Sequence, residues 1–119
     1  MNIQFYQVDA FAETLFSGNP AGVCMLNDWL EDKELQAIAE ENNLSETAFV
    51  IPKGKDYQIR WFTPSREVDL CGHATLASAF VLFQNLSEQR EELIFHSNSG
   101  ILPVRKSSGL LQLDFPSLP

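Results

Sequence analysis

The chain has 119 residues, 45% of them hydrophobic, and a formal net charge of −8. This length suits one domain with its own core, so we expect a single domain over residues 1–119. The acidic charge disfavours nucleic acids and anionic membrane surfaces as partners. The N-terminal residues lack the pattern of a signal peptide, and no apolar run is long enough to span a bilayer. Two cysteines without metal-ligand spacing, Cys24 and Cys71, predict reduced thiols in a cytoplasmic protein.

The first part of the chain predicts two strands followed by a helix. Residues 3–11 are rich in β-branched and aromatic side chains and predict a strand. A turn at 18–20 then leads into a second strand over 21–26. Apolar residues at helical spacing predict an amphipathic helix over about 31–42, and Asn43 suits a left-handed stop after it.

Two further strands precede a second, different helix. Residues 48–51 predict a buried strand that Pro52 ends, and alternation over 57–61 predicts a half-buried one. The run from Glu67 to Ala77 then predicts a strand that ends in a tight glycine turn and opens into a helix. This helix continues to about Phe83 with almost no polar atoms on any face, so we expect the rest of the domain to enclose it.

The last part of the chain predicts a strand and a hairpin. The strand covers 91–96, and the hairpin pairs 101–105 with 110–115. The sum is about six or seven strands, one peripheral helix and one central helix. We therefore predict an α+β fold in which a strongly bent, mostly antiparallel sheet wraps around the apolar helix.

The glycine turn before the central helix is a candidate binding site. The helix N-terminus presents unpaired N–H groups and the positive end of the helix dipole, and Gly72 lets a carboxylate come close to them. His73 lies in the first turn, where the dipole favours its neutral form, and it could position a substrate or merely cap the turn. Cys71 is either a buried apolar residue or a thiol whose pKa falls at the helix N-terminus.

Three segments in order resemble the phenazine-biosynthesis PhzF-like family, relatives of diaminopimelate epimerase. They are Phe16–Val23, Asn43–Val50 and the run from Glu67 to Ala77. The likeness extends from Val8 to about Phe83 and weakly beyond. It implies a barrel-like lobe, and family members carry two such lobes with the active site between them. The chain resembles only the N-terminal lobe, so it is either a fragment or a half that pairs with a second copy.

The resemblance also implies roles for individual residues. Glu46 inherits the role of general acid/base, which a carboxylate partly withdrawn from water can perform. Cys71 lies in a turn similar to one that carries a catalytic base in related epimerases and proline racemases. Asn19 and Ser45 could hydrogen-bond a substrate, although both also favour turns on their own account. We expect no cofactor and no metal, because no phosphate loop, dinucleotide fingerprint or metal-ligand spacing is present.

Other polar residues suggest structural roles. We interpret Asp69 as a buried-edge acid that orients the glycine turn, Cys24 as core, and His96 as structural or exposed. Arg60 and Arg66 could bind a substrate carboxylate, but flanking charges are more often solvated.

These patterns lead to one main hypothesis and two alternatives. The main hypothesis is an isomerase or epimerase lobe in which Glu46 transfers a proton on a small carboxylate-bearing substrate without a cofactor, with Gly72 and His73 at the carboxylate. One alternative is a non-catalytic half-enzyme or small-acid binding module, and the other is a racemase that depends on the Cys71 thiol. An uncovered cleft face predicts a symmetric homodimer that places two copies of Glu46 across one cleft.

Overall fold

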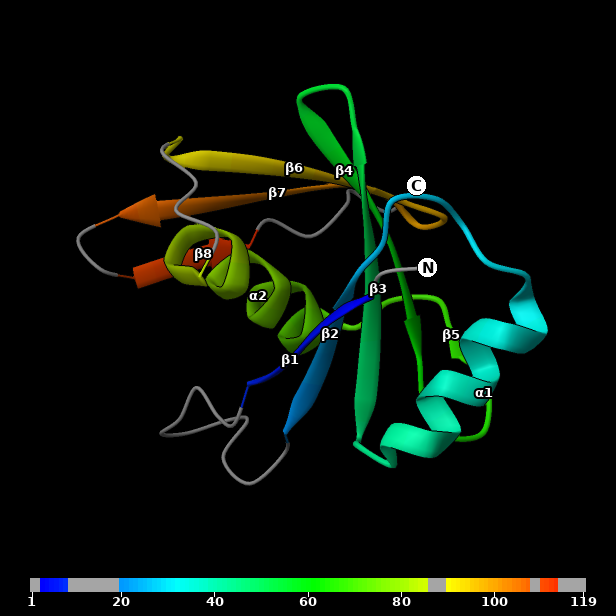
Figure 1. The fold of residues 1–119 in the computed structure, drawn as a ribbon. Coiled ribbons are helices and arrows are strands. Elements are labelled where there is room, and N and C mark those ends of the chain that lie inside the picture. Colours follow the sequence, from blue (N-terminus) through cyan, green and yellow to red (C-terminus); the bar gives the residue numbers. More distant parts are fainter. Residues whose placement is uncertain (1–2, 9–19, 86–89, 108–109, 114–119) are drawn as a thin grey trace.

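The described part of the chain folds as a curled, eight-stranded β-sheet with helix α2 on its inner face and helix α1 on its outer face (Figure 1). The computed structural model describes residues 3–8, 20–85, 90–107 and 110–113. The strands are β1 (Gln4–Val8), β2 (Ala21–Met25), β3 (Glu46–Lys53), β4 (Asp56–Phe62), β5 (Glu67–Val68), β6 (Glu92–Ser97), β7 (Gly100–Ser107) and β8 (Leu110–Leu113). The helices are α1 (Asp32–Asn42) and α2 (Gly72–Phe80), and α2 continues into a π-helical turn, η1 (Val81–Asn85). In the described part of the chain, no helix has both the length and the apolar character that crossing a membrane requires.

The sheet is mixed but mostly antiparallel. Its strands follow the order β1-β2-β3-β4-β6-β7-β8, and the short β5 pairs with β4 beside this path. The pairs β2–β3 and β4–β6 are parallel, and the other pairs are antiparallel. The predicted α+β fold with a bent sheet around a central helix is confirmed. The predicted strand ahead of the glycine turn is confirmed as β5, which has only two residues.

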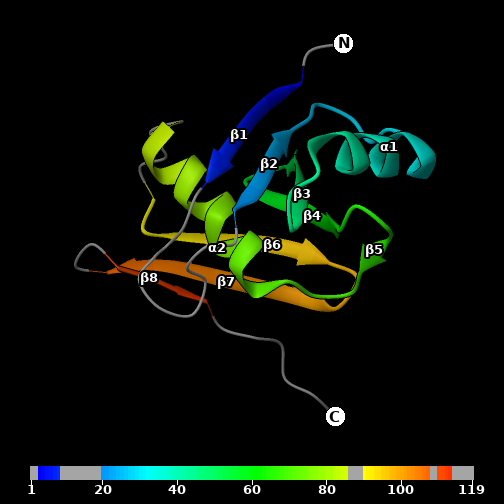
Figure 2. The ribbon, with the colours of Figure 1, turned by 90° about the horizontal axis from the view of Figure 1, so that it is seen from below.

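The inner core lies between α2 and the concave face of the sheet. Helix α2 contacts β2, β3 and β8, and Figure 2 shows β6, β7 and β8 passing beneath it. Small residues on the helix, among them Ala74 and Ala77, are fully buried and let the strands approach closely. The predicted enclosure of the apolar helix is confirmed, except that Phe80 near its end stays 38% exposed.

The outer face of the sheet is covered by α1. Leu35 and Ala39 of this helix pack on Phe49 and Phe62, whereas Ala48 of the same strand β3 faces the inner core. The middle of strand β3 is therefore buried on both faces, which explains why residues 48–51 are continuously apolar rather than alternating. The helix begins with a capping box at Glu31 and Glu34, and its predicted left-handed stop is confirmed by a φ of 53° at Asn43.

Strand β3 extends beyond its predicted limits at both ends. It begins at Glu46, and it runs through Pro52, which was expected to end it. Proline is tolerated there because the pairing of β2 stops at Met25, opposite Val50, so Pro52 has a paired neighbour on the β4 side alone. The early start matters more, because it makes Glu46 part of the sheet rather than of a loop.

Gly22 of β2 is required by close packing. A Cβ atom at this position would lie 2.9 Å from the ring of Phe5 and 3.1 Å from Leu44. A larger residue would therefore require the side chains of Phe5 and Leu44 to shift. This accounts for one glycine of the segment Phe16–Val23; residues 16–19 lie outside the described part of the chain.

Candidate active site

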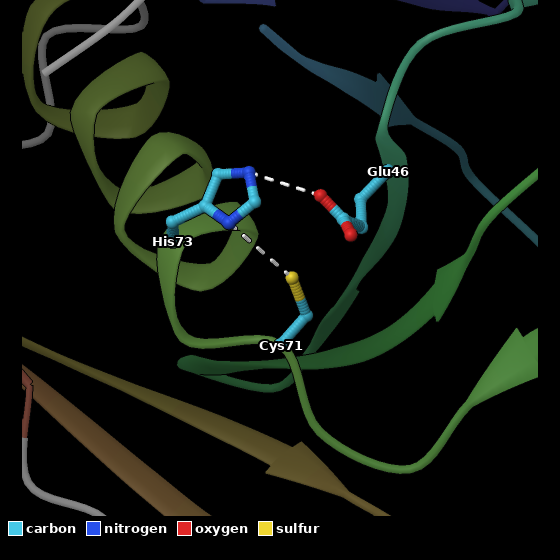
Figure 3. A group of neighbouring side chains, drawn as sticks. All are labelled: Glu46, Cys71 and His73. Atoms are coloured by element: carbon cyan, nitrogen blue, oxygen red, sulfur yellow. Dashed lines mark hydrogen bonds and ion pairs between the residues drawn. The ribbon is translucent and has the colours of Figure 1, made fainter. Parts of the chain in front are cut away.

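Three reactive side chains meet where α2 begins and β3 begins. Glu46 opens β3 opposite Ala21 of β2, Cys71 is the N-cap residue of α2, and His73 lies in the first turn of that helix. Figure 3 shows the imidazole of His73 between the other two side chains. The fold thus joins one residue from the sheet with two from the helix start.

The distances within this cluster are short. His73 Nε2 lies 3.0 Å from Glu46 Oε1, and His73 Nδ1 lies 3.7 Å from Cys71 Sγ. The first contact has the distance of an ion pair but not the alignment of a hydrogen bond, so it is strongest when the imidazole is charged. The second is a hydrogen bond whose direction depends on the histidine tautomer.

The cluster is largely withdrawn from solvent but not sealed. The side chains of His73 and Glu46 are 13% and 22% exposed, and the two atoms that face each other are buried. Glu46 Oε1 accepts no hydrogen bond from the described residues. A partly desolvated carboxylate is suited to accept a proton from a bound molecule.

A buried hydrogen-bond chain fixes the helix start. Trp61 Nε1 donates to Thr75 Oγ1 at 3.0 Å, and Thr75 Oγ1 donates to the carbonyl oxygen of Cys71 at 2.8 Å. Trp61 belongs to β4, so this chain ties the first turn of α2 to the centre of the sheet. The sequence pattern does not predict a role in the site for either residue. The signal that could have revealed them is a threonine in the middle of a mostly apolar helix.

The structure bears on the two interpretations of the Cys71 thiol, which is buried at the helix start. Burial raises the pKa of Cys71 to about 11, and the nearby charge of Glu46 also raises it, while the backbone N–H groups of Ala74 and His73 lower it less. Desolvation of the thiolate therefore outweighs the helix N-terminus. Cys71 is a neutral thiol near pH 7, which does not suit the base of the thiol-dependent alternative.

We predict that iodoacetamide modifies Cys71 slowly, with a rate that keeps rising about tenfold per pH unit from pH 7 to 10. The reason is that the reactive thiolate is a minor species throughout this range when the pKa is about 11. The measurement is mass spectrometry of the intact chain after timed labelling. In urea, the same thiol should react faster and level off near pH 9, as a solvated cysteine does. A plateau near pH 8 in the folded protein would contradict the prediction.

Comparison with known proteins identifies the family. Residues 8–117 match the family model PhzC-PhzF, described as phenazine biosynthesis-like protein. The chain belongs to this family. It is 57% identical, over 98% of its length, to an uncharacterized isomerase of Pseudomonas aeruginosa. It is 45% identical to the mouse phenazine biosynthesis-like domain-containing protein 1, over its whole length. The chain spans about 45% of the length of these relatives.

Solved structures give the same assignment. A PhzF-family protein of Enterococcus faecalis aligns with a TM-score of 0.83 and 57% identity, covering 91% of this chain and 42% of that one. A PhzC/PhzF protein of Clostridium difficile aligns with a TM-score of 0.87 and 46% identity, covering 98% of this chain and 45% of that one. A hydroxyproline epimerase of Agrobacterium vitis, at 10% identity and a TM-score of 0.61, shares the fold. The predicted resemblance is confirmed, and the fold is that of PhzF-like isomerases and epimerases.

Of the other predicted site residues of this PhzF-like chain, Gly72 and Ser45 are described by the structure and Asn19 is not. Gly72 is half-buried at the first position of α2, beside Cys71 and His73. Ser45 is exposed and directly precedes Glu46. Asn19 lies outside the described residues, although Ala21, two positions later, is paired with Glu46.

Asp69 and Arg60 differ from the roles considered for them at the site. Asp69 is exposed rather than buried; its backbone carbonyl, not its carboxylate, holds the loop by accepting a hydrogen bond from Ser99. Arg60 pairs with both oxygens of Glu67 at 2.8 Å and with Asp32 at 3.0 Å, which raises its pKa further. Its charge is therefore already neutralised, and it does not suit a carboxylate-binding role.

Cys24, His96 and Arg66 have surroundings that fit structural roles. Cys24 is 1% exposed in the core beneath α1, as predicted. His96 is half-buried and pairs with Asp56 at 2.9 Å, which fits a structural role. Arg66 is exposed, and its backbone closes the turn with Thr63.

Proposed function

We propose that this chain carries the general acid/base and the substrate-carboxylate site of a PhzF-like isomerase. Glu46 removes a proton from a carbon next to a carbonyl or unsaturated group and returns a proton elsewhere. The support is the contact between the Glu46 carboxylate and His73, 3.0 Å long, at the N-terminus of a buried helix. The names of the similar bacterial relatives, uncharacterized isomerases, agree with this reaction class.

The surroundings of Glu46 support separate roles for the start of α2 and for His73. The N–H groups at the start of α2 and its dipole favour an anion near Gly72, so the substrate carboxylate is held there. His73 then lies between the anion site and Glu46, where it hydrogen-bonds the substrate or stabilises charge that develops during proton transfer. The proposed substrate is a small carboxylic acid with an acidic C–H bond, and none of these steps calls for a cofactor.

Hydrogen exchange tests this function directly. The chain is incubated in D₂O with a panel of small unsaturated and keto acids, and deuterium incorporation at carbon is followed by NMR. Catalysed incorporation into one member of the panel is expected. Chemical-shift changes at the Gly72 and His73 amides without incorporation would instead favour the binding-module alternative.

We also propose that the chain forms a symmetric homodimer across the site. Leu70, adjacent to the cluster, is a large apolar side chain that is 38% exposed. A second copy would cover this face and add a second Glu46 to one cleft. Light scattering over a range of concentrations is expected to give twice the mass of 13.4 kDa. A constant monomer mass up to millimolar concentration would reject this proposal.

A further inference from the structure

The same cluster contains the donor atoms of a metal site, which the sequence spacing did not indicate. Glu46, Cys71 and His73 each offer one ligand atom, and these atoms lie within 4.8 Å of one another. Thiolate, imidazole and carboxylate are the three ligand types that Zn²⁺ takes in proteins. Glu46 is distant in sequence from the other two, so no ligand spacing is visible in the chain.

We propose that Cys71 and His73 bind a thiophilic divalent cation such as Zn²⁺, with Glu46 held against the opposite nitrogen of the imidazole. The distance from Cys71 Sγ to His73 Nδ1 is 3.7 Å. Two ligands at about 2.3 Å and 2.0 Å on a tetrahedral ion lie about 3.5 Å apart. A cation therefore fits between these atoms with almost no movement of either side chain. On binding, the thiol releases its proton to solvent and coordinates as thiolate.

Glu46 occupies the position of an outer partner in this arrangement. Metal-binding histidines in proteins usually direct their second ring nitrogen at a carboxylate or carbonyl, which fixes the ring and strengthens the ligand. His73 does so here, because its Nε2 lies 3.0 Å from Glu46 Oε1 while its Nδ1 faces Cys71. The same contact that serves proton transfer thus also orients the imidazole toward the sulfur.

Electrostatics decides the class of ion. The N-terminus of α2 opposes a cation, but the Cys71 thiolate and the Glu46 carboxylate together offset the charge of a divalent ion. The net charge of −8 further favours cations over anions at long range. With two protein ligands the ion keeps open positions for water or a carboxylate. Hard ions such as Mg²⁺ are disfavoured, because they require oxygen ligands.

The test uses the 119-residue chain with Zn²⁺ and Co²⁺ alone, so it does not depend on the proposed activity. We expect one equivalent of Co²⁺ to give a thiolate-to-cobalt charge-transfer band that Zn²⁺ abolishes. Cys71→Ser should remove the band and weaken Zn²⁺ binding at least about tenfold, and Glu46→Gln should weaken it about 10- to 100-fold. Cys24→Ala and His96→Gln are controls that should retain the band.

Several outcomes would overturn the proposal. They are the absence of the band in the unsubstituted chain, wild-type Zn²⁺ affinity in Cys71→Ser, and loss of binding in His96→Gln, which would locate the ion at the His96–Asp56 pair. If Cys71→Ser does not fold, as judged by circular dichroism, His73→Gln replaces it with the same expected loss. Metal binding without deuterium exchange would reject the proton-transfer function alone, and exchange without the band would reject the metal site alone.

Discussion

Replacing Glu46 with glutamine is expected to reduce deuterium incorporation about 10²- to 10⁴-fold, the usual contribution of a general acid/base. Glutamine keeps the shape of the side chain and its place at the start of β3, but it cannot accept the substrate proton. The measurement is the initial rate of incorporation by NMR, at equal enzyme concentration and with the acid that responds most strongly to the unsubstituted chain.

The matched control is Asp69→Asn, which removes the same charge from an exposed carboxylate near the helix start. This variant should keep the full exchange rate. An unchanged rate in Glu46→Gln would show that another group takes the proton. Circular dichroism of both variants checks that a lost rate is not a lost fold.

The candidate site could be predicted only where its signal is local. The glycine turn before α2 was predicted because glycine, an N-terminal helix signal and flanking titratable residues lie together in sequence. Glu46 was reached through the family motif, because nothing in its own neighbourhood states that it will contact His73. That contact depends on the parallel pairing of β2 with β3, which sets the start of β3 beside α2.

The fold, like the site, could be predicted from the sequence only where the signal is local. The helix at 31–42 and the strands over 21–26 and 57–61 follow from periodicity, and the structure confirms them within a residue or two. The parallel pairing of β4 with β6 consists of two residue pairs, Tyr57 with Phe95 and Gln58 with His96. No local pattern encodes such a long-range pairing, so it could not be predicted.

The choice between the two interpretations of Cys71 depends on burial, which periodicity does not report. A helix N-terminus lowers a thiol pKa through nearby N–H groups, and this local effect is readable from sequence. Burial acts in the opposite direction, and its size depends on how closely the rest of the fold surrounds the sulfur. Cys71 is 9% exposed, and desolvation decides the outcome.

Truncation of Trp61 is expected to give the largest loss of stability. Trp61→Ala should lower the free energy of unfolding by about 3–5 kcal/mol, because it leaves a large cavity in the inner core. Trp61 is 2% exposed, and it donates the hydrogen bond that anchors Thr75 and the first turn of α2. The measurement is urea unfolding followed by circular dichroism, which does not rely on tryptophan fluorescence.

The matched control is the other tryptophan, Trp29, which is half-buried on the outer face and donates to Gln58. Trp29→Ala removes the same side chain but leaves its site open to solvent, so it should cost clearly less than Trp61→Ala. Equal losses in the two variants would contradict the assignment of Trp61 to the core. Trp61→Phe separates packing from hydrogen bonding, because it keeps most of the ring volume and should lose about 1–2 kcal/mol. If Trp61 also holds the site, this variant should speed up labelling of Cys71, since the carbonyl of Cys71 is fixed through Thr75.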